Sequence, residues 1–196
     1  VHAAWQDGFD AVGAASIGPL LGSRKWLGAT EVVTLLRFLS IPARVVDFEG
    51  TKFASKTGLV AATTQWIYSY FTTVWPRTAG LYVQDEVFVP PLYMQWQGHS
   101  VTVVGIDYNE RCPEFSTLLV FDPAESTAML ESALRNDGRI PQSIAVSATS
   151  LLSRKAMQFV YVDAEPLTLA SRDASRVIVA EPWSFLTAAV VATVSR

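Results

Sequence analysis

The sequence predicts an α+β fold in which a mixed or antiparallel sheet is flanked by helices. Apolar residues recur at helical spacing over 29–39 and again over 59–73. Three strand-like runs then follow one another at 92–95, 99–108 and 115–122. With 196 residues and 50% hydrophobic content, the chain is long enough for one well-filled core and fits one domain better than two.

The first helix, 29–39, has one apolar face and a favourable first turn. Its apolar residues are Val32, Val33, Leu36 and Leu39. Glu31 in the first turn places an acidic group near the positive end of the helix dipole. Pro42 prevents the helix from continuing, and the β-branched residues within 43–48 predict a short strand after it.

In the second helix, 59–73, Trp66 and Tyr70 are four residues apart and fall on one face, which predicts an aromatic stripe packed in the core. Further along the chain, the pattern predicts a surface helix at 125–135, a weaker helix at 147–154 and a closing strand at 157–163. From Pro166 onward no clear period is present, so residues 166–196 are expected to form a tail of uncertain structure.

Composition excludes several classes of function. The net charge is −3 and the basic residues are scattered, so nucleic acid is not an expected partner. The longest apolar stretch, 185–194, is well short of the ~20 residues that span a bilayer, so no membrane anchor is expected. A single cysteine and the lack of a secretory leader predict an intracellular location, cytoplasmic or nuclear. His2 is the only histidine besides His99, and no phosphate-binding glycine loop occurs, so neither a metal site nor a cofactor is predicted.

Hairpin arithmetic brings one histidine and one aspartate together. If 99–108 and 115–122 pair antiparallel, Tyr108 lies opposite Phe115, and residue numbers that face each other sum to about 223. His99 and Asp122 sum to 221, an offset of only two residues. Their side chains therefore lie at the same end of the hairpin, with Cβ atoms roughly 5 to 8 Å apart.

An imidazole beside a carboxylate is what nucleophilic catalysis requires of its base. The imidazole removes the proton of the nucleophile, and the carboxylate fixes the tautomer and stabilises the imidazolium. Gly98 is expected to allow close approach of the backbone, and Pro123 to end the strand. The alternative is structural: His99 satisfies a buried partner, and Asp122 caps a helix that begins near Glu125.

The nucleophile is not evident among these residues. Cys112 is the only thiol, and it lies ten residues from Asp122 along an extended strand, on the order of 30 Å away. An ordinary loop position is therefore expected for it. No Gly-x-Ser-x-Gly sequence is present to offer an activated serine.

Three segments, in order, resemble one family of cysteine peptidases. They are Trp26–Glu31 (WLGATE), Pro91–Ile106 (PLYMQWQGHSVTVVGI) and Leu118–Pro123 (LLVFDP). The chain resembles the zinc-finger ubiquitin-specific protease family (ZUFSP) and the related proteases of the ubiquitin-fold modifier (UFSP). This resemblance implies a papain-like cysteine peptidase fold of which the N-terminal part is missing, since the nucleophilic cysteine of the family belongs upstream of Val1.

The resemblance implies that His99 is the catalytic base and Asp122 its orienting partner. The modifier-directed branch resembles Asp-Pro-His, whereas this chain has Ala124 at the last position, so the ubiquitin-directed branch is the better match. Family members resemble Gln-His-Gln-Gly-His where residues 95–99 of this chain are Gln-Trp-Gln-Gly-His, so Trp96 departs from the family pattern. Packing is the expected role of this tryptophan. Gln97 is a candidate oxyanion donor, to which no role is assigned.

The function expected is therefore that of a cysteine-type deubiquitinase fragment, with residues 1–165 forming the C-terminal portion of the peptidase domain. Ubiquitin or polyubiquitin is the expected partner, and the fragment by itself is expected to be inactive for lack of the nucleophile. Three alternatives stay open: a module that binds ubiquitin or a ubiquitin-like protein without cleaving it, a protease of the ubiquitin-fold modifier, and an incomplete product that folds poorly.

Overall fold

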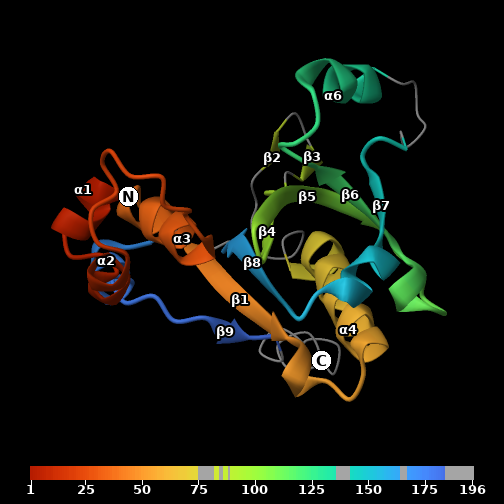
Figure 1. Ribbon diagram of the computed structural model, residues 1–196, viewed down its shortest axis with the longest axis horizontal. Coiled ribbons are helices and arrows are strands. Elements are labelled where there is room, and N and C mark those ends of the chain that lie inside the picture. Colours follow the sequence, from red (N-terminus) through yellow and green to blue (C-terminus); the bar gives the residue numbers. More distant parts are fainter. Residues whose placement is uncertain (75–81, 84–85, 88, 136–141, 164–166, 184–196) are drawn as a thin grey trace.

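A seven-stranded sheet is the centre of the fold in the computed structural model (Figure 1), which describes residues 1–74, 82–83, 86–87, 89–135, 142–163 and 167–183. The strand order is β7-β6-β5-β4-β8-β1-β9. The strands are β1 (Ala43–Glu49), β4 (Leu92–Trp96), β5 (His99–Asp107), β6 (Thr117–Phe121), β7 (Ala145–Ser147), β8 (Ala156–Val162) and β9 (Glu181–Pro182). A separate two-stranded ribbon pairs β2 (Tyr82–Val83) with β3 (Glu86–Val87).

The sheet is mixed. Strand β9 runs parallel to β1, and every other neighbouring pair is antiparallel. Helices lie beside it (Figure 1). They are α1 (His2–Gln6), α2 (Ala11–Ile17), α3 (Ala29–Phe38), α4 (Lys56–Ser69), α6 (Thr127–Leu134) and α7 (Leu169–Ala174). The predicted α+β class and the mixed sheet are therefore confirmed.

Helix α4 packs its aromatic face into the main core. Trp66 and Tyr70 are almost fully buried, and their rings stack with centroids 6.1 Å apart. The same core includes Leu92 and Met94 of β4 and Val103 of β5. The predicted aromatic stripe is thus confirmed, although the α-helix ends at Ser69 and a π-helical turn (Tyr70–Val74) follows it.

Helix α3 forms a smaller core with β1 and β8. Ala29 and Val33 of the helix pack there with Val45 and Val160. Glu31 accepts a hydrogen bond from the Gly28 N–H at 2.6 Å, so its carboxylate satisfies a free donor at the start of the helix, as its first-turn position predicted.

The predicted strand 43–48 and the closing strand 157–163 are confirmed as β1 and β8. The surface helix expected from 125 begins at Thr127 as α6, after Ser126, whose hydroxyl accepts from the Met129 N–H. The weaker helix expected at 147–154 is a 3₁₀-helix, η4 (Ala148–Ser153). Two further 3₁₀ turns are η1 (Gly50–Lys52) and η3 (Pro113–Phe115). Phe115, expected to begin a strand, belongs to η3.

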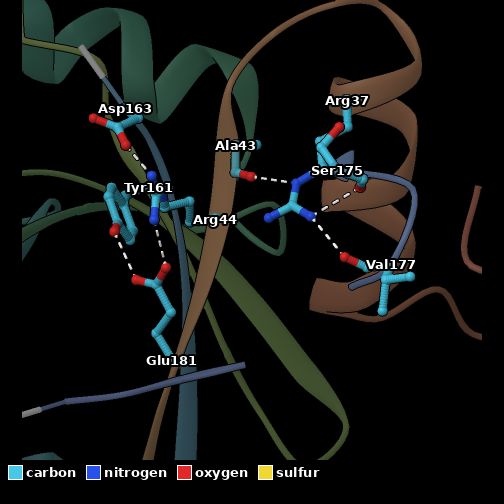
Figure 2. Close-up of polar contacts among 8 residues, drawn as sticks. All are labelled: Arg37, Ala43, Arg44, Tyr161, Asp163, Ser175, Val177 and Glu181. Carbon is cyan, nitrogen blue, oxygen red and sulfur yellow. Dashed lines mark hydrogen bonds and ion pairs between the residues drawn. The ribbon is translucent and has the colours of Figure 1, made fainter. Parts of the chain in front are cut away.

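The 167–183 segment, for which the sequence indicated no structure, forms α7 and β9 and is held by two arginines (Figure 2). Arg37 of α3 donates from Nη1 to the carbonyls of Ser175 and Val177, at 3.0 and 3.1 Å. Arg44 of β1 pairs with Glu181 at 2.7 Å. Arg44 also pairs with Asp163, and Tyr161 donates to the second carboxylate oxygen of Glu181. These contacts fix the segment to α3, β1 and β8. The apolar stretch 185–194 lies outside the described residues, and none of the described helices is long and apolar enough to cross a membrane.

Candidate active site

His99 is placed by the tight turn that joins β4 to β5. Trp96 pairs with His99 across the two strands, so only Gln97 and Gly98 form the turn. Gly98 has a φ of +79°, which is unfavourable for residues with a side chain, and a Cβ built there would meet nothing within 4 Å. The glycine is therefore needed for its positive φ, and the expectation that it allows close backbone approach is wrong.

Asp122 is placed by the turn that follows β6. The Glu125 N–H donates to the Asp122 carbonyl at 3.0 Å, which closes a turn with Pro123 at its second position, where proline is favoured. The Ala124 N–H donates to Oδ1 of Asp122 at 2.8 Å. Asp122 thus caps this turn rather than a helix, because Ser126 serves the start of α6.

The two side chains meet: Nε2 of His99 lies 2.9 Å from Oδ2 of Asp122. Near this end of the hairpin the observed register is Thr102 with Phe121, a sum of 223, as the hairpin arithmetic predicted. A bulge between Val103 and Gly105 shifts the register only toward the far end. The predicted juxtaposition of His99 with Asp122 is confirmed.

The pair lies at the rim of the main core. Alternation along β5 puts His99 on the same face as Val101 and Val103, which are 4% and 0% exposed. Asp122 comes two residues after Val120, which is 5% exposed, so alternation puts Asp122 on the same face of the sheet as Val120. The side chains of His99 and Asp122 are 33% and 34% exposed, so a reacting partner can reach them.

Electrostatics favour the ionised form of Asp122. Partial burial raises the pKa of this carboxyl group, but the Ala124 N–H and His99 together outweigh burial, so its pKa lies below the ordinary value. An ionised Asp122 accepts a proton-bearing Nε2, which leaves Nδ1 of the neutral imidazole as the basic nitrogen. Within the described part of the chain, Nδ1 has no hydrogen-bond partner.

Two cavities are bordered by residues at this end of the hairpin. A cavity of about 290 Å³ is bordered by Trp96 and Gln97 together with Asp47 and Gln158. Another, of about 320 Å³, is bordered by Asp122 and Ser100. The second cavity therefore adjoins Asp122, and the first adjoins Trp96, the cross-strand partner of His99.

Cys112 lies far from the pair. It precedes η3 in the loop at the opposite end of the β5–β6 hairpin, where its N–H donates to Asn109. Eight residue steps along β5 separate that end from His99, a distance on the order of 25 Å. The loop position predicted for Cys112 is confirmed. Among the residues that the structure describes, no group of three or more His, Cys, Asp or Glu could hold a metal ion.

Sequence reasoning found the pair but missed the contact that flanks it. The ring of Trp96 lies 5.1 Å from the His99 ring, centroid to centroid, and the Arg154 guanidinium lies 4.7 Å from the centroid of Trp96. Arg154 is distant in sequence and follows a 3₁₀-helix. The hairpin could have indicated Trp96, but no sequence signal indicates Arg154.

Comparison with known proteins identifies the family. The model of peptidase family C78 matches residues 1–161. The chain belongs to peptidase family C78. The resemblance that WLGATE, QGHS and FDP carry in the sequence is thereby confirmed.

Curated relatives are similar over much of the chain. It is 33% identical over 186 residues to the bovine (Bos taurus) protein named zinc finger-containing ubiquitin peptidase 1, and 30% identical over 187 residues to the human (Homo sapiens) protein of that name. Each alignment covers 92% of this chain but 31% of the relative. Ubiquitin carboxyl-terminal hydrolase mug105 of Schizosaccharomyces pombe is 34% identical over 120 residues, 61% of this chain and 42% of that protein. The chain thus spans about a third of the length of the first two relatives.

Proposed function

We propose that this C78 chain is the part of a ubiquitin-directed cysteine peptidase that carries the general base, His99, and the carboxylate that orients it, Asp122. The observation that carries the proposal is the 2.9 Å contact between Nε2 and Oδ2, with the second oxygen of Asp122 occupied by the Ala124 N–H. A carboxylate held at both oxygens fixes the imidazole in one tautomer, as a catalytic base requires. A papain-like arrangement of the complete domain is part of this proposal.

The proposed reaction is the hydrolysis of an isopeptide bond. His99 takes the thiol proton at Nδ1, and the thiolate attacks the carbonyl carbon of the terminal glycine of the modifier. The imidazolium, stabilised by Asp122, then protonates the departing lysine amine, which leaves a thioester. Water, deprotonated by His99, hydrolyses the thioester and restores the thiol.

The thiol of this reaction comes from outside these 196 residues. Cys112 cannot supply it, because the β5–β6 hairpin separates Cys112 from His99 by its full length. The chain on its own is therefore expected to lack peptidase activity while retaining the preformed His99–Asp122 pair.

Ubiquitin is the proposed substrate because the curated relatives carry ubiquitin-peptidase names. The local structure agrees with this choice over the ubiquitin-fold modifier. The modifier-directed branch resembles Asp-Pro-His, but residue 124 of this chain is alanine, so the position two residues after Asp122 holds no histidine. The Ala124 N–H donates to Asp122.

A covalent probe tests this proposal. The natural protein that contains this chain is treated with ubiquitin bearing a thiol-reactive C-terminal group, and in parallel with the equivalent derivative of the ubiquitin-fold modifier. We expect labelling by the ubiquitin probe, strong loss of labelling in His99→Ala, and no loss in His2→Ala, which removes the other histidine. Binding of ubiquitin without labelling would instead indicate a non-catalytic module, and labelling by only the other probe would overturn the substrate.

A further inference from the structure

The ring of Trp96 forms a wall beside the His99 imidazole. The two residues are cross-strand partners at the last rung of the β4–β5 hairpin. Their ring centroids are 5.1 Å apart and their planes are inclined by 53°. Aromatic pairs attract each other at this spacing. The indole also occupies the space on one side of the imidazole, so the imidazole cannot rotate in that direction.

Arg154 holds the indole in turn. Its guanidinium carbon lies over the Trp96 ring at 4.7 Å from the centroid, the geometry of a cation–π contact. The backbone of Arg154 is fixed by its N–H, which donates to the Leu151 carbonyl at 2.9 Å. Its Nε is buried, with no hydrogen-bond partner among the described residues. The Trp96 ring is thus the cation–π partner of this guanidinium.

A single hydrogen bond would not fix His99. About a third of each side chain in the His99–Asp122 pair is exposed, so water competes for Oδ2 and the imidazole can rotate away. The wall opposes that rotation and covers one side of the pair. Trp96 itself packs against the main core and cannot easily yield.

We propose that Trp96, braced by Arg154, is a positioning residue that keeps the His99 imidazole on Asp122 in the Nε2–H tautomer. This inference rests on the proposed function of His99. Trp96 acts through His99 and is not assigned contact with the substrate.

Nitrogen-15 NMR of the imidazoles of this chain tests the proposal. The chain has two histidines, so a His2→Ala background leaves only the signals of His99. We expect the Nε2–H tautomer in the parent. In Trp96→Ala we expect a population of the other tautomer, with exchange of the Nε2 proton faster by roughly threefold to tenfold, as loss of one aromatic contact implies. Trp96→Phe keeps an aromatic wall and should restore most of the parental signal.

Two further variants keep the result decisive. Arg154→Ala leaves Trp96 in place but removes its brace, and it should shift the His99 signals in the same direction as Trp96→Ala. If Trp96→Ala does not fold, the His99 signals of Arg154→Ala decide between the two outcomes. Tyr68→Ala is the matched control, because Tyr68 stacks on Tyr108 at 4.3 Å, away from the site, and its loss should leave His99 unchanged.

Unchanged tautomer and proton exchange in folded Trp96→Ala and Arg154→Ala would overturn the positioning role. This readout needs no nucleophile and no substrate. Failure of the positioning role therefore shows in the NMR signals, whereas failure of the proposed function shows in the absence of probe labelling.

Discussion

Oδ1 of Asp122 accepts from the backbone N–H of Ala124 at 2.8 Å, so the backbone fixes the orientation of the carboxylate while Oδ2 faces His99. Two donors thus need two acceptor oxygens. Asparagine has one acceptor oxygen and one NH2 donor, so Asp122→Asn can keep the Ala124 contact only by donating to Nε2, which puts the imidazole proton on Nδ1. We expect the substitution to lower kcat/KM of the nucleophile-containing protein by roughly 10²- to 10⁴-fold, since a wrongly held imidazole is a poor base. Steady-state kinetics on a ubiquitin C-terminal amide measure this, and a loss confined to KM would contradict it.

Asp122 should make stability depend on pH in the acid range. Its pKa in the folded chain is lowered, by Ala124 and His99 against the effect of burial. A depressed folded pKa contributes stability that is present above the unfolded pKa, about 3.9, and is lost as pH falls through the folded value. Urea unfolding of the parent and of Asp122→Asn should therefore differ above about pH 4 and converge below it. A difference that stayed constant with pH would contradict the shift.

Gly98→Ala should destabilise the chain through its backbone alone. The φ of +79° is unfavourable for alanine, and nothing lies within 4 Å of the new Cβ, so a cost of about 1 kcal/mol from backbone strain is expected without a clash. Gly22→Ala is a matched control, because Gly22 has a φ of +73° and equally open surroundings. Both variants should unfold at lower urea, but only Gly98→Ala should alter the NMR signals of His99. Equal effects on His99 would argue against the turn as the element that places it.

Arg37→Ala should release the 167–183 segment. The variant removes the donors to Ser175, Val177 and Ala43, and a hydrogen bond to a charged group contributes a net of about 1.5–3 kcal/mol. Amide hydrogen exchange should accelerate across the 167–183 segment while β5 and β6 stay protected. Lys25→Ala is a suitable control, since Lys25 is an exposed cation that contacts Ile17 away from this segment. Unchanged exchange in Arg37→Ala would show that the arginine does not hold the segment.

The sequence predicted the candidate pair because the register at the end of the hairpin that carries His99 and Asp122 is the one that the arithmetic assumed, with facing residue numbers that sum to 223. A shift of one residue there would have turned one side chain to the other face of the sheet. The bulge between Val103 and Gly105 shifts the register by one residue toward the loop, and His99 and Asp122 lie on the other side of it. The long helix that carries Trp66 was predictable because apolar residues recur at helical spacing in its sequence.

The 167–183 segment could not be predicted in the same way. Its elements are short, and it is held by Arg37, which donates to backbone carbonyls that every sequence provides. The ion pair between Arg44 and Glu181 joins residues far apart in the chain, with no periodic pattern to indicate it. The bracing of Trp96 by Arg154 escaped prediction for the same reason.

The most direct test of the role of His99 compares two histidine variants of the natural protein that contains this chain. The measurement is kcat/KM for hydrolysis of a ubiquitin C-terminal amide by His99→Ala and by His2→Ala. We predict a loss of at least roughly 10²-fold for His99→Ala, because the general base is removed, and parental activity for His2→Ala. Activity retained in His99→Ala would contradict the role of this imidazole as the base.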